Sequence, residues 1–191
     1  MSIAQRHAYL TAEDFLRGED GAEKKHEYLN GVVYAMAGGT NRHARLAGNI
    51  FGGLFARLRG KQCQPFNSDT LTRVQRGPDL RFYYPDVSVI CEQNALDEHF
   101  QDHPVVIFEV LSESTARLDR GEKREAYLTI PSLRVLVLVE TDTMAVTLWR
   151  RTGESWAQED ATAPEQVLSF PEIECELPLA EIYEGSGLSG S

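Results

Sequence analysis

Two acidic residues lie inside stretches that are otherwise typical of buried strands. Glu109 interrupts the continuous apolar run 105–111, and Asp86 lies within 82–90, which is rich in Tyr, Val and Ile. A lone carboxylate in such a position costs several kcal/mol unless it is paired or bound to a cation. The two acids are 23 positions apart, which leaves room for a loop and a return, so neighbouring strands can bring both carboxylates to one end of a sheet. For Asp86 alone, an ordinary acid at a turn or strand end is the alternative interpretation.

A lysine follows this pair of acids at a useful distance. Two carboxylates at one sheet end suit Mg²⁺, which binds through one or two carboxylates, waters and phosphate oxygens. Lys123 comes 14 residues after Glu109, on a predicted helix whose early turns return over the sheet end, and it shares a helix face with Tyr127. An amine there can orient or deprotonate a water, or stabilise the charge of a transition state. The alternative is a solvent-exposed helix lysine.

The first half of the chain contains strong local structure signals. Thr11 to Asp14 has the form of a capping box and predicts a short helix that runs to about Arg17 and ends at Gly18. The Asn30-Gly31 pair between strand-forming residues predicts a hairpin over 26–36. Apolar residues spaced by four then predict an amphipathic helix over 41–59; they are Leu46, Ile50, Leu54 and Leu58, with Phe51 and Phe55 beside them.

The second half is predicted to alternate between strands and helix. The predicted strands are 70–74, 81–90, 104–111, 133–140 and 144–150, with a loop over 94–103. A helix is predicted over 114–128, with Ser114 or Thr115 as N-cap and Pro131 as its stop. This order predicts one α/β sandwich on a central mixed sheet flanked by helices, with an N-terminal helix and hairpin. We expect one domain over 1–184 and a flexible tail over 185–191.

Composition and charge restrict the class of protein. The net charge is −10, but residues 42–81 carry eight Lys and Arg against two Asp. This local excess is either one solvated basic helix face or a surface for a polyanion. No apolar run is long enough to span a membrane, and the N-terminus lacks the pattern of a secretory signal. The widely spaced Cys63, Cys91 and Cys175 predict reduced thiols, and we therefore expect a cytoplasmic protein without membrane contact.

Several stretches together resemble a known family. Pro85-Asp86 followed by Glu109 resembles the core pattern of the PD-(D/E)XK phosphodiesterase superfamily, which has the restriction-endonuclease-like fold. More closely, the chain over about residues 7–183 resembles the bacterial Uma-two family of endonucleases, long catalogued as a domain of unknown function. The stretches that carry this likeness are EYLNGVV at 27–33, PDVSV at 85–89, VIFEVLSEST at 106–115 and DRGEKREAY at 119–127. The last two, from Glu109 to Tyr127, are the most specific.

The resemblance implies roles for the residues already singled out. Asp86 and Glu109 would hold Mg²⁺ or Mn²⁺, with the carbonyl of Val110 as a further ligand. The superfamily pattern expects a lysine two residues after Glu109, where this chain has Leu111. In the resembling family, Lys123 on the following helix takes over that place.

The resemblance also adds residues around this centre. Glu27 would be a further acidic metal ligand, the alternative being an exposed acid at a strand end. His43 would touch substrate or assist proton transfer, the alternative being a helix-cap or surface histidine. Ser112 and Tyr127 would support the metal ligands.

We therefore expect a metal-dependent endonuclease that hydrolyses phosphodiester bonds in nucleic acid, with DNA favoured over RNA. A homodimer is compatible with cutting both strands, which takes two sites. Two alternatives stay open. One is a non-catalytic nucleic-acid-binding or regulatory protein on a nuclease scaffold, which the overall acidity favours. The other is a hydrolase of a small phosphodiester.

Overall fold

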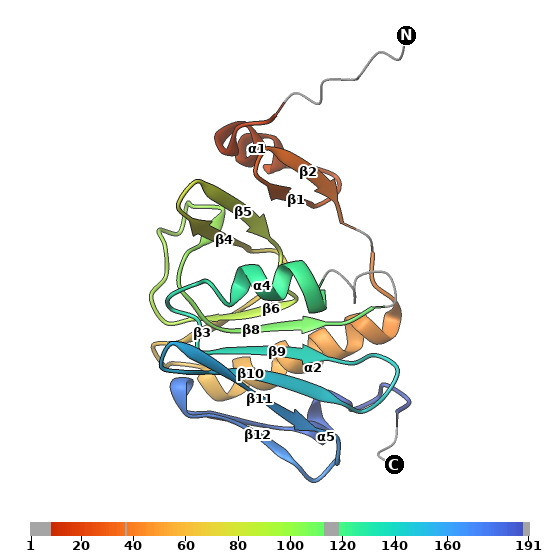
Figure 1. Ribbon diagram of the computed structural model, residues 1–191. Coiled ribbons are helices and arrows are strands. Elements are labelled where there is room, and N and C mark those ends of the chain that lie inside the picture. The colour runs from red at the N-terminus through yellow and green to blue at the C-terminus, as the bar shows by residue number, and fades with distance from the viewer. Residues whose placement is uncertain (1–8, 37, 113–118, 189–191) are drawn as a thin grey trace.

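A six-stranded mixed sheet forms the centre of the molecule (Figure 1). The computed structural model describes residues 9–36, 38–112 and 119–188. Strands β8 and β9 are parallel, and the other neighbours in this sheet are antiparallel. The strand order is β11 (Ser155–Ala161), β10 (Val146–Thr152), β9 (Val135–Val139), β8 (Pro104–Val110), β6 (Val87–Ile90) and β3 (Gln64–Asn67).

Helix α2 (Asn41–Leu58) covers one face of this sheet. Its four core leucine and isoleucine side chains, predicted from their spacing of four, have no exposed surface. They pack against alternate residues of the strands, among them Phe108 and Val110 of β8. The same apolar layer is completed by β12 (Val167–Phe170), a 3₁₀ turn (Pro171–Ile173), β13 (Cys175–Pro178) and α5 (Leu179–Ile182).

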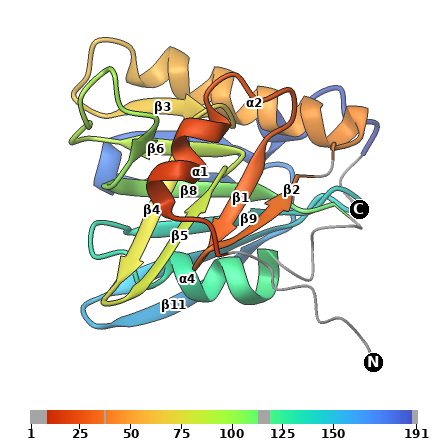
Figure 2. The same ribbon diagram turned by 90° about the horizontal axis from the view of Figure 1, so that it is seen from above.

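The opposite face is covered by a second sheet and one short helix. The second sheet has the order β2 (Val32–Ala35), β1 (His26–Leu29), β5 (Asp79–Tyr83), β4 (Leu71–Arg76) and β7 (Phe100–Gln101). Helix α4 (Arg124–Tyr127) lies between β4–β5 and the central sheet in Figure 1, and packs Tyr127 into the core between them. Figure 2 looks down on this layer and shows α1 (Ala12–Glu19) with the β1–β2 hairpin nearest the viewer.

The N-terminal predictions from capping and turn residues are confirmed with one change. Asn30 and Gly31 have φ values of 50° and 93°, as a two-residue hairpin turn requires, and join β1 to β2. Thr11 is the N-cap of α1, and its hydroxyl accepts a hydrogen bond from the backbone N–H of Asp14. The helix ends at Glu19, one residue after the predicted end at Gly18.

Several strand and helix boundaries differ from the predictions. The single strand predicted over 81–90 is two strands in different sheets, since Pro85 lacks a backbone donor and interrupts the ladder. Strand β3 was not predicted, and β7 lies within the predicted loop 94–103. In the described part of the helix predicted over 114–128, a π-helical turn, Asp119–Lys123, is followed by α4. Its predicted N-cap, Ser114 or Thr115, lies outside the described residues.

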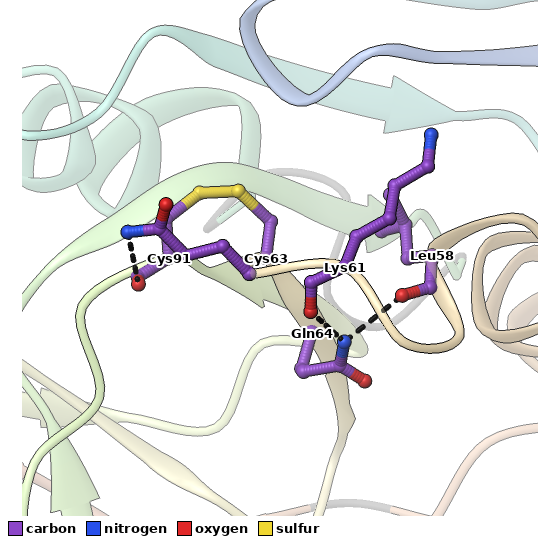
Figure 3. Close-up of a disulfide and its surroundings, with 6 residues drawn as sticks. Leu58, Lys61, Cys63, Gln64 and Cys91 are labelled. Atoms are coloured by element: carbon purple, nitrogen blue, oxygen red, sulfur yellow. Dashed lines mark hydrogen bonds between the residues drawn. A yellow bond between two sulfur atoms is a disulfide. The ribbon is translucent and has the colours of Figure 1, made fainter.

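The prediction of three reduced cysteines is wrong for two of them. Cys63 and Cys91 form a disulfide (Figure 3). Cys175 is free and buried. Gln64 and Ile90 form the last pair of the β3–β6 ladder, so the two cysteines are the next cross-strand neighbours, with Cα atoms 3.9 Å apart. Their spacing of 28 residues gives no hint of this contact. Disulfides are rare in the cytosol, so the cysteines no longer support a cytoplasmic location.

The end of the chain and its membrane character were also predicted. Of the segment 185–191, predicted as a flexible tail, residues 185–188 contact the body. Ser186 is 9% exposed and its carbonyl accepts a hydrogen bond from Arg42 Nε at 3.1 Å, while Leu188 packs on the core beside α2. Residues 189–191 lie outside the described part. Within the described residues, no helix is both long and apolar enough to cross a membrane.

Candidate active site

Strand pairing brings the two predicted acids together. In the antiparallel β6–β8 ladder, Val87 lies opposite Phe108, so one step beyond the end of β6 places Asp86 next to Glu109. The Asp86 carboxylate accepts a hydrogen bond of 2.7 Å from the backbone N–H of Val110. This bond fixes Asp86 at the end of strands β6 and β8, although Pro85 and Asp86 themselves belong to no strand.

Glu109 is a buried acid on the face of β8 that carries Ile107 and Leu111. Its side chain is almost without exposed surface, and its Oε1 accepts a hydrogen bond of 2.8 Å from the Tyr127 hydroxyl. Burial raises the pKa of Glu109 well above its usual value, and the negative charges of Asp119, Asp86 and Glu27 add to this effect. The charge of Lys123 opposes the rise in pKa. Ionised Glu109 therefore needs a positive charge beside it.

Lys123 supplies a positive charge from the π-helical turn. Its Nζ lies 2.7 Å from Glu27 Oε1, 3.6 Å from Glu109 Oε1 and 3.6 Å from Asp119 Oδ1. The residue is only 5% exposed, so the interpretation as a solvent-exposed helix lysine is wrong. Burial lowers the pKa of Lys123, but the three carboxylates outweigh it and raise the pKa above its ordinary value. Lys123 is thus a permanent cation near neutral pH, suited to stabilising negative charge rather than to accepting a proton.

Asp119 belongs to this cluster and was missed by the sequence reasoning. It is buried at the start of the π-helical turn and lies one turn before Lys123. π-Helical turns are uncommon and frequently mark functional sites. The spacing of four residues between Asp119 and Lys123 was visible in the sequence, but it is equally typical of an exposed ion pair on a helix.

Glu27 reaches the cluster from the second sheet. It lies in β1, which pairs with β5 through Tyr28 and Phe82, and it is 6% exposed. The alternative of an exposed acid at a strand end is therefore wrong. Burial raises the pKa of the Glu27 carboxyl, and the charge and hydrogen bond of Lys123 act against this.

His43 contacts Asp86 from the first turn of α2. Its Nε2 lies 3.3 Å from Asp86 Oδ2, and the hydrogen bond to Asp86 raises the pKa of the imidazole. The backbone N–H of His43 donates to the Thr40 hydroxyl, which caps the helix. A Cβ on Gly39 would lie 2.6 Å from Nδ1 of His43, so a glycine at position 39 leaves the space that this ring position requires.

The remaining predicted residues divide between two places. Tyr127 is fully buried and bonded to Glu109, as a supporting residue would be. Ser112 lines a neighbouring cleft of about 520 Å³ at the N-terminal end of α2, together with Arg42, Arg45 and Thr141. The structure thus brings Glu27, Asp86, Glu109, Lys123, Tyr127 and His43 into one network and places Ser112 at its margin.

The chemistry of these side chains fits a hard divalent cation. Three carboxylates surround Lys123, and Asp86 lies near one of them, Glu109. Mg²⁺ prefers oxygen ligands and needs only one or two carboxylates. The pair of Asp86 and Glu109 meets that requirement. Among the described residues, no group of three or more His, Cys, Asp and Glu side chains is arranged to hold a metal ion by itself, and the Glu27 carboxylate is bonded to Lys123. Waters and substrate oxygens would complete such a coordination shell.

The basic segment 42–81 does not form one free basic face. Arg57 is paired with Glu181, Arg73 with Asp102, and Arg81 with both Asp79 and Glu122. These residues are also distributed over α2, β4 and β5. The local charge excess therefore serves in part to neutralise acids of the same chain.

Other proteins are similar to this chain in sequence. Two proteins of Synechocystis sp. (strain ATCC 27184 / PCC 6803 / Kazusa) are similar to the chain. The uncharacterized protein slr1290 is 32% identical over 146 residues, which are 76% of each chain. The uncharacterized protein sll1609 is 31% identical over 157 residues, 81% of this chain and 88% of the other.

A solved structure supports the fold. The crystal structure of a putative nuclease belonging to DUF820 from Anabaena variabilis ATCC 29413 superposes with a TM-score of 0.71 and 17% identity, over 91% of this chain and 97% of the other. The restriction-endonuclease-like α/β fold expected from the sequence is thereby confirmed. The Uma2 family, described as "Putative restriction endonuclease", matches residues 12–180. The chain therefore belongs to the Uma2 family.

Proposed function

We propose that the protein is a metal-dependent nuclease that hydrolyses phosphodiester bonds of DNA. The observation that carries the proposal is the meeting of Asp86 and Glu109 at one sheet edge beside the buried cation of Lys123. Buried charges cost stability, and strongly perturbed acids in a cluster are typical of catalytic sites. Membership of a family described as a restriction endonuclease supports the same reaction class.

The chain's own residues prepare the site for a divalent cation. A Mg²⁺ or Mn²⁺ ion held by Asp86 and Glu109 would polarise the scissile phosphate and lower the pKa of a bound water. Tyr127 donates a hydrogen bond to Glu109 and orients it. The backbone N–H of Val110 and the ring of His43 orient Asp86 in the same way.

Lys123 stabilises the negative charge that develops on the phosphate. Its amine is the permanent cation of the cluster and is held by Glu27, Glu109 and Asp119. Fixed charges in a buried site are worth more than the same charges in water, and they need no reorganisation during the reaction. Glu27 and Asp119 therefore act as positioning residues for Lys123, and Glu27 is a metal ligand only if it leaves this ion pair.

The partner in this proposal is nucleic acid, with DNA first. Phosphate contacts would be weakened by salt and would carry no sequence information. Double-strand cleavage would take two copies of the chain, one for each strand, whereas cutting one strand takes a single copy.

The direct test is a cleavage assay with Mn²⁺. Supercoiled and single-stranded DNA are incubated with the wild type, Asp86→Ala, Glu109→Ala and the control Glu122→Gln. Glu122 is bonded to Tyr83 and Arg81 outside the cluster, so this variant also loses one acid but should keep its activity. We expect the two alanine variants to lose at least about a hundredfold in rate. Equal activity in all four proteins would mean that a contaminant cleaves the DNA, and the proposal would fail.

The rival function is a non-catalytic binding protein on a nuclease scaffold. One observation favours it: Lys123 already neutralises part of the carboxylate cluster without a metal ion. A binding protein of this kind would neither cleave DNA nor take up Mn²⁺.

A further inference from the structure

A cleft beside the candidate active site shows what form of substrate the protein can hold. The cleft has a volume of about 750 Å³, and its lining includes Asp86, His43 and Met36, which follows the hairpin. Its size lies within the range of about 300–1,000 Å³ that is usual for ligand sites. The same acid that we propose as a metal ligand therefore faces a cavity of ligand size.

One face of α2 forms the floor of this cleft and extends beyond it. Ala44, Gly48, Phe51 and Phe55 follow one another at spacings of four, three and four residues, so they share a helix face. The first three line the cleft. A Cβ added to Gly48 would meet no atom within 4 Å, so the helix surface is bare there. The floor of the cleft therefore consists of the small residues Ala44 and Gly48, followed by the ring of Phe51.

The two phenylalanines form an aromatic platform at the outer end of this face. The rings of Phe51 and Phe55 are stacked, with centroids 5.9 Å apart and an interplanar angle of 23°. Phe55 is 48% exposed, which is unusual for so large an apolar side chain. In proteins that bind single-stranded nucleic acid, exposed aromatic rings typically stack on bases. Any base can stack on such a ring because each base has a π-face.

The charges around the cleft fit one strand better than two. Lys24 and Lys25 also line the cleft, and Lys25 donates hydrogen bonds to the Ser68 carbonyl and to Asp69. A duplex presents phosphates of both strands and demands many basic contacts. The bases of a duplex also cover one another's faces, so they reach an aromatic platform only when unpaired.

We propose that the cleft binds a single strand of DNA, with its unpaired bases on Phe51 and Phe55 and its backbone running past Gly48 toward Asp86. This inference rests on the proposed nuclease function and specifies its substrate as single-stranded DNA or an unpaired segment of a duplex. Gly48 leaves space for the DNA backbone, and Phe55 stacks on a base before the strand reaches the carboxylates.

A pair of glycine variants tests the path. Gly48→Leu places a side chain in the cleft, whereas Gly18→Leu places the same side chain on α1 outside the cleft lining, and neither Cβ meets an atom within 4 Å. Both replace a helical glycine and should leave the thermal unfolding temperature unchanged or higher. Binding is measured by fluorescence anisotropy with a labelled thymidine dodecamer and with its duplex, in EDTA so that the DNA stays intact.

We expect the wild type to bind the single strand at least about tenfold more tightly than the duplex. Gly48→Leu should weaken single-strand binding by about tenfold or more, and Gly18→Leu should not. Phe55→Ala should weaken it by roughly five- to a hundredfold, the loss of one base stack. Equal affinity for both DNA forms, or equal behaviour of the two glycine variants, would overturn the inference.

The outcomes separate this inference from the proposed function. Cleavage of DNA with Mn²⁺ together with duplex affinity as high as single-strand affinity would overturn the substrate form and leave the nuclease intact. Single-strand binding that Gly48→Leu abolishes, without cleavage, would support the binding path and contradict the nuclease. Absence of both binding and cleavage would overturn both.

Discussion

The two faces of β8 are buried to the same degree but are stabilised in different ways. Phe108 is 0% exposed and packs with α2 in an entirely apolar layer, and Glu109, the next residue, is 3% exposed and faces a network of charges. Adjacent strand residues point to opposite faces, so one strand borders both environments. On the α2 side, the contribution to the free energy of unfolding comes from apolar packing. On the other side, it depends on the balance of four carboxylates against Lys123 and His43.

This contrast indicates where the sequence is constrained by function. A buried charge network is rarely more stable than an apolar replacement of the same shape. The face toward α2 shows that the same strand can be packed with apolar residues throughout. Glu109 and its partners are therefore better explained by chemistry than by folding, and the contrast predicts different responses to pH and to mutation.

The largest expected effect comes from removing the central cation. Lys123→Met leaves Glu27, Glu109 and Asp119 without their shared amine, and should cost about 3–5 kcal/mol of unfolding free energy at pH 8. The cost should be smaller at pH 5, because burial raises the pKa values of Glu27 and Glu109, so a larger fraction of these acids is protonated at the lower pH. Urea unfolding at the two pH values measures the difference.

The matched variant for the apolar face is Phe108→Ala. It should cost a similar amount, about 3–5 kcal/mol, through the cavity that it leaves. This cost should be the same at pH 5 and pH 8, because Cys175 and Tyr183 of this layer have pKa values raised by burial and stay neutral across that range. A pH-independent cost for Lys123→Met would contradict the contrast between the faces.

The disulfide provides a second variant whose effect on the free energy of unfolding does not depend on the charge network. Cys63 and Cys91 lie at the opposite end of the β3–β6 ladder from Asp86. Cys63→Ser should cost about 2–4 kcal/mol by releasing a 28-residue loop in the unfolded chain. Thermal unfolding with and without a reducing agent measures this cost, which reduction of the wild type should reproduce. A thiol assay that finds three free cysteines in the untreated protein would show that the bond does not form.

A smaller effect of opposite sign is expected for Glu109→Gln. The raised pKa of Glu109 means that ionisation in the folded state lowers stability as pH rises above the ordinary carboxyl range. The neutral amide removes this loss and should stabilise the metal-free protein by about 1 kcal/mol at pH 8, with no gain near pH 4. Urea unfolding in EDTA checks the sign. A clear loss of stability at pH 8 would show that the charge of Glu109 is needed for folding.

The smallest effect concerns His43. Its pKa is raised by the hydrogen bond to Asp86, so its contribution is fully present below the ordinary value of 6.5 and is lost as pH rises through the higher folded-state pKa. His43→Gln should therefore cost about 0.5–1 kcal/mol at pH 6 and less at pH 9. The comparison uses chemical unfolding of the wild type and the variant at both pH values. An equal cost at pH 6 and pH 9 would show that a charged pair of His43 with Asp86 does not contribute to stability.

Local signals made much of the fold predictable from the sequence. The Asn30-Gly31 turn, the stripe on α2 and the apolar run of β8 each have one strong local cause, and each is confirmed. Features that depend on distant contacts were missed. Strand β3 contains a proline and no alternation, and only its pairing with β6 defines it. The partnership of Cys63 with Cys91 follows from the same pairing.

The candidate site was predictable in its acids but less so in their network. Glu109 and Asp86 stood out because acids are unexpected in apolar strands. Asp119 lies in a charged segment where an acid attracts no notice, and its burial results from the π-helical turn. Ser112 follows Glu109 closely in sequence, yet it lines the cleft at the start of α2. Sequence distance after a strand end does not show to which side the chain turns.

The central claim is that Asp86 and Glu109 together hold a divalent cation. Titration calorimetry of Mn²⁺ into the wild type, Asp86→Asn, Glu109→Gln and the control Glu122→Gln tests it most directly. We predict one Mn²⁺ site in the wild type and in Glu122→Gln, weakened by at least about tenfold when either of the two acids is neutralised. No Mn²⁺ uptake by the wild type, or equal uptake by all four proteins, would contradict the claim.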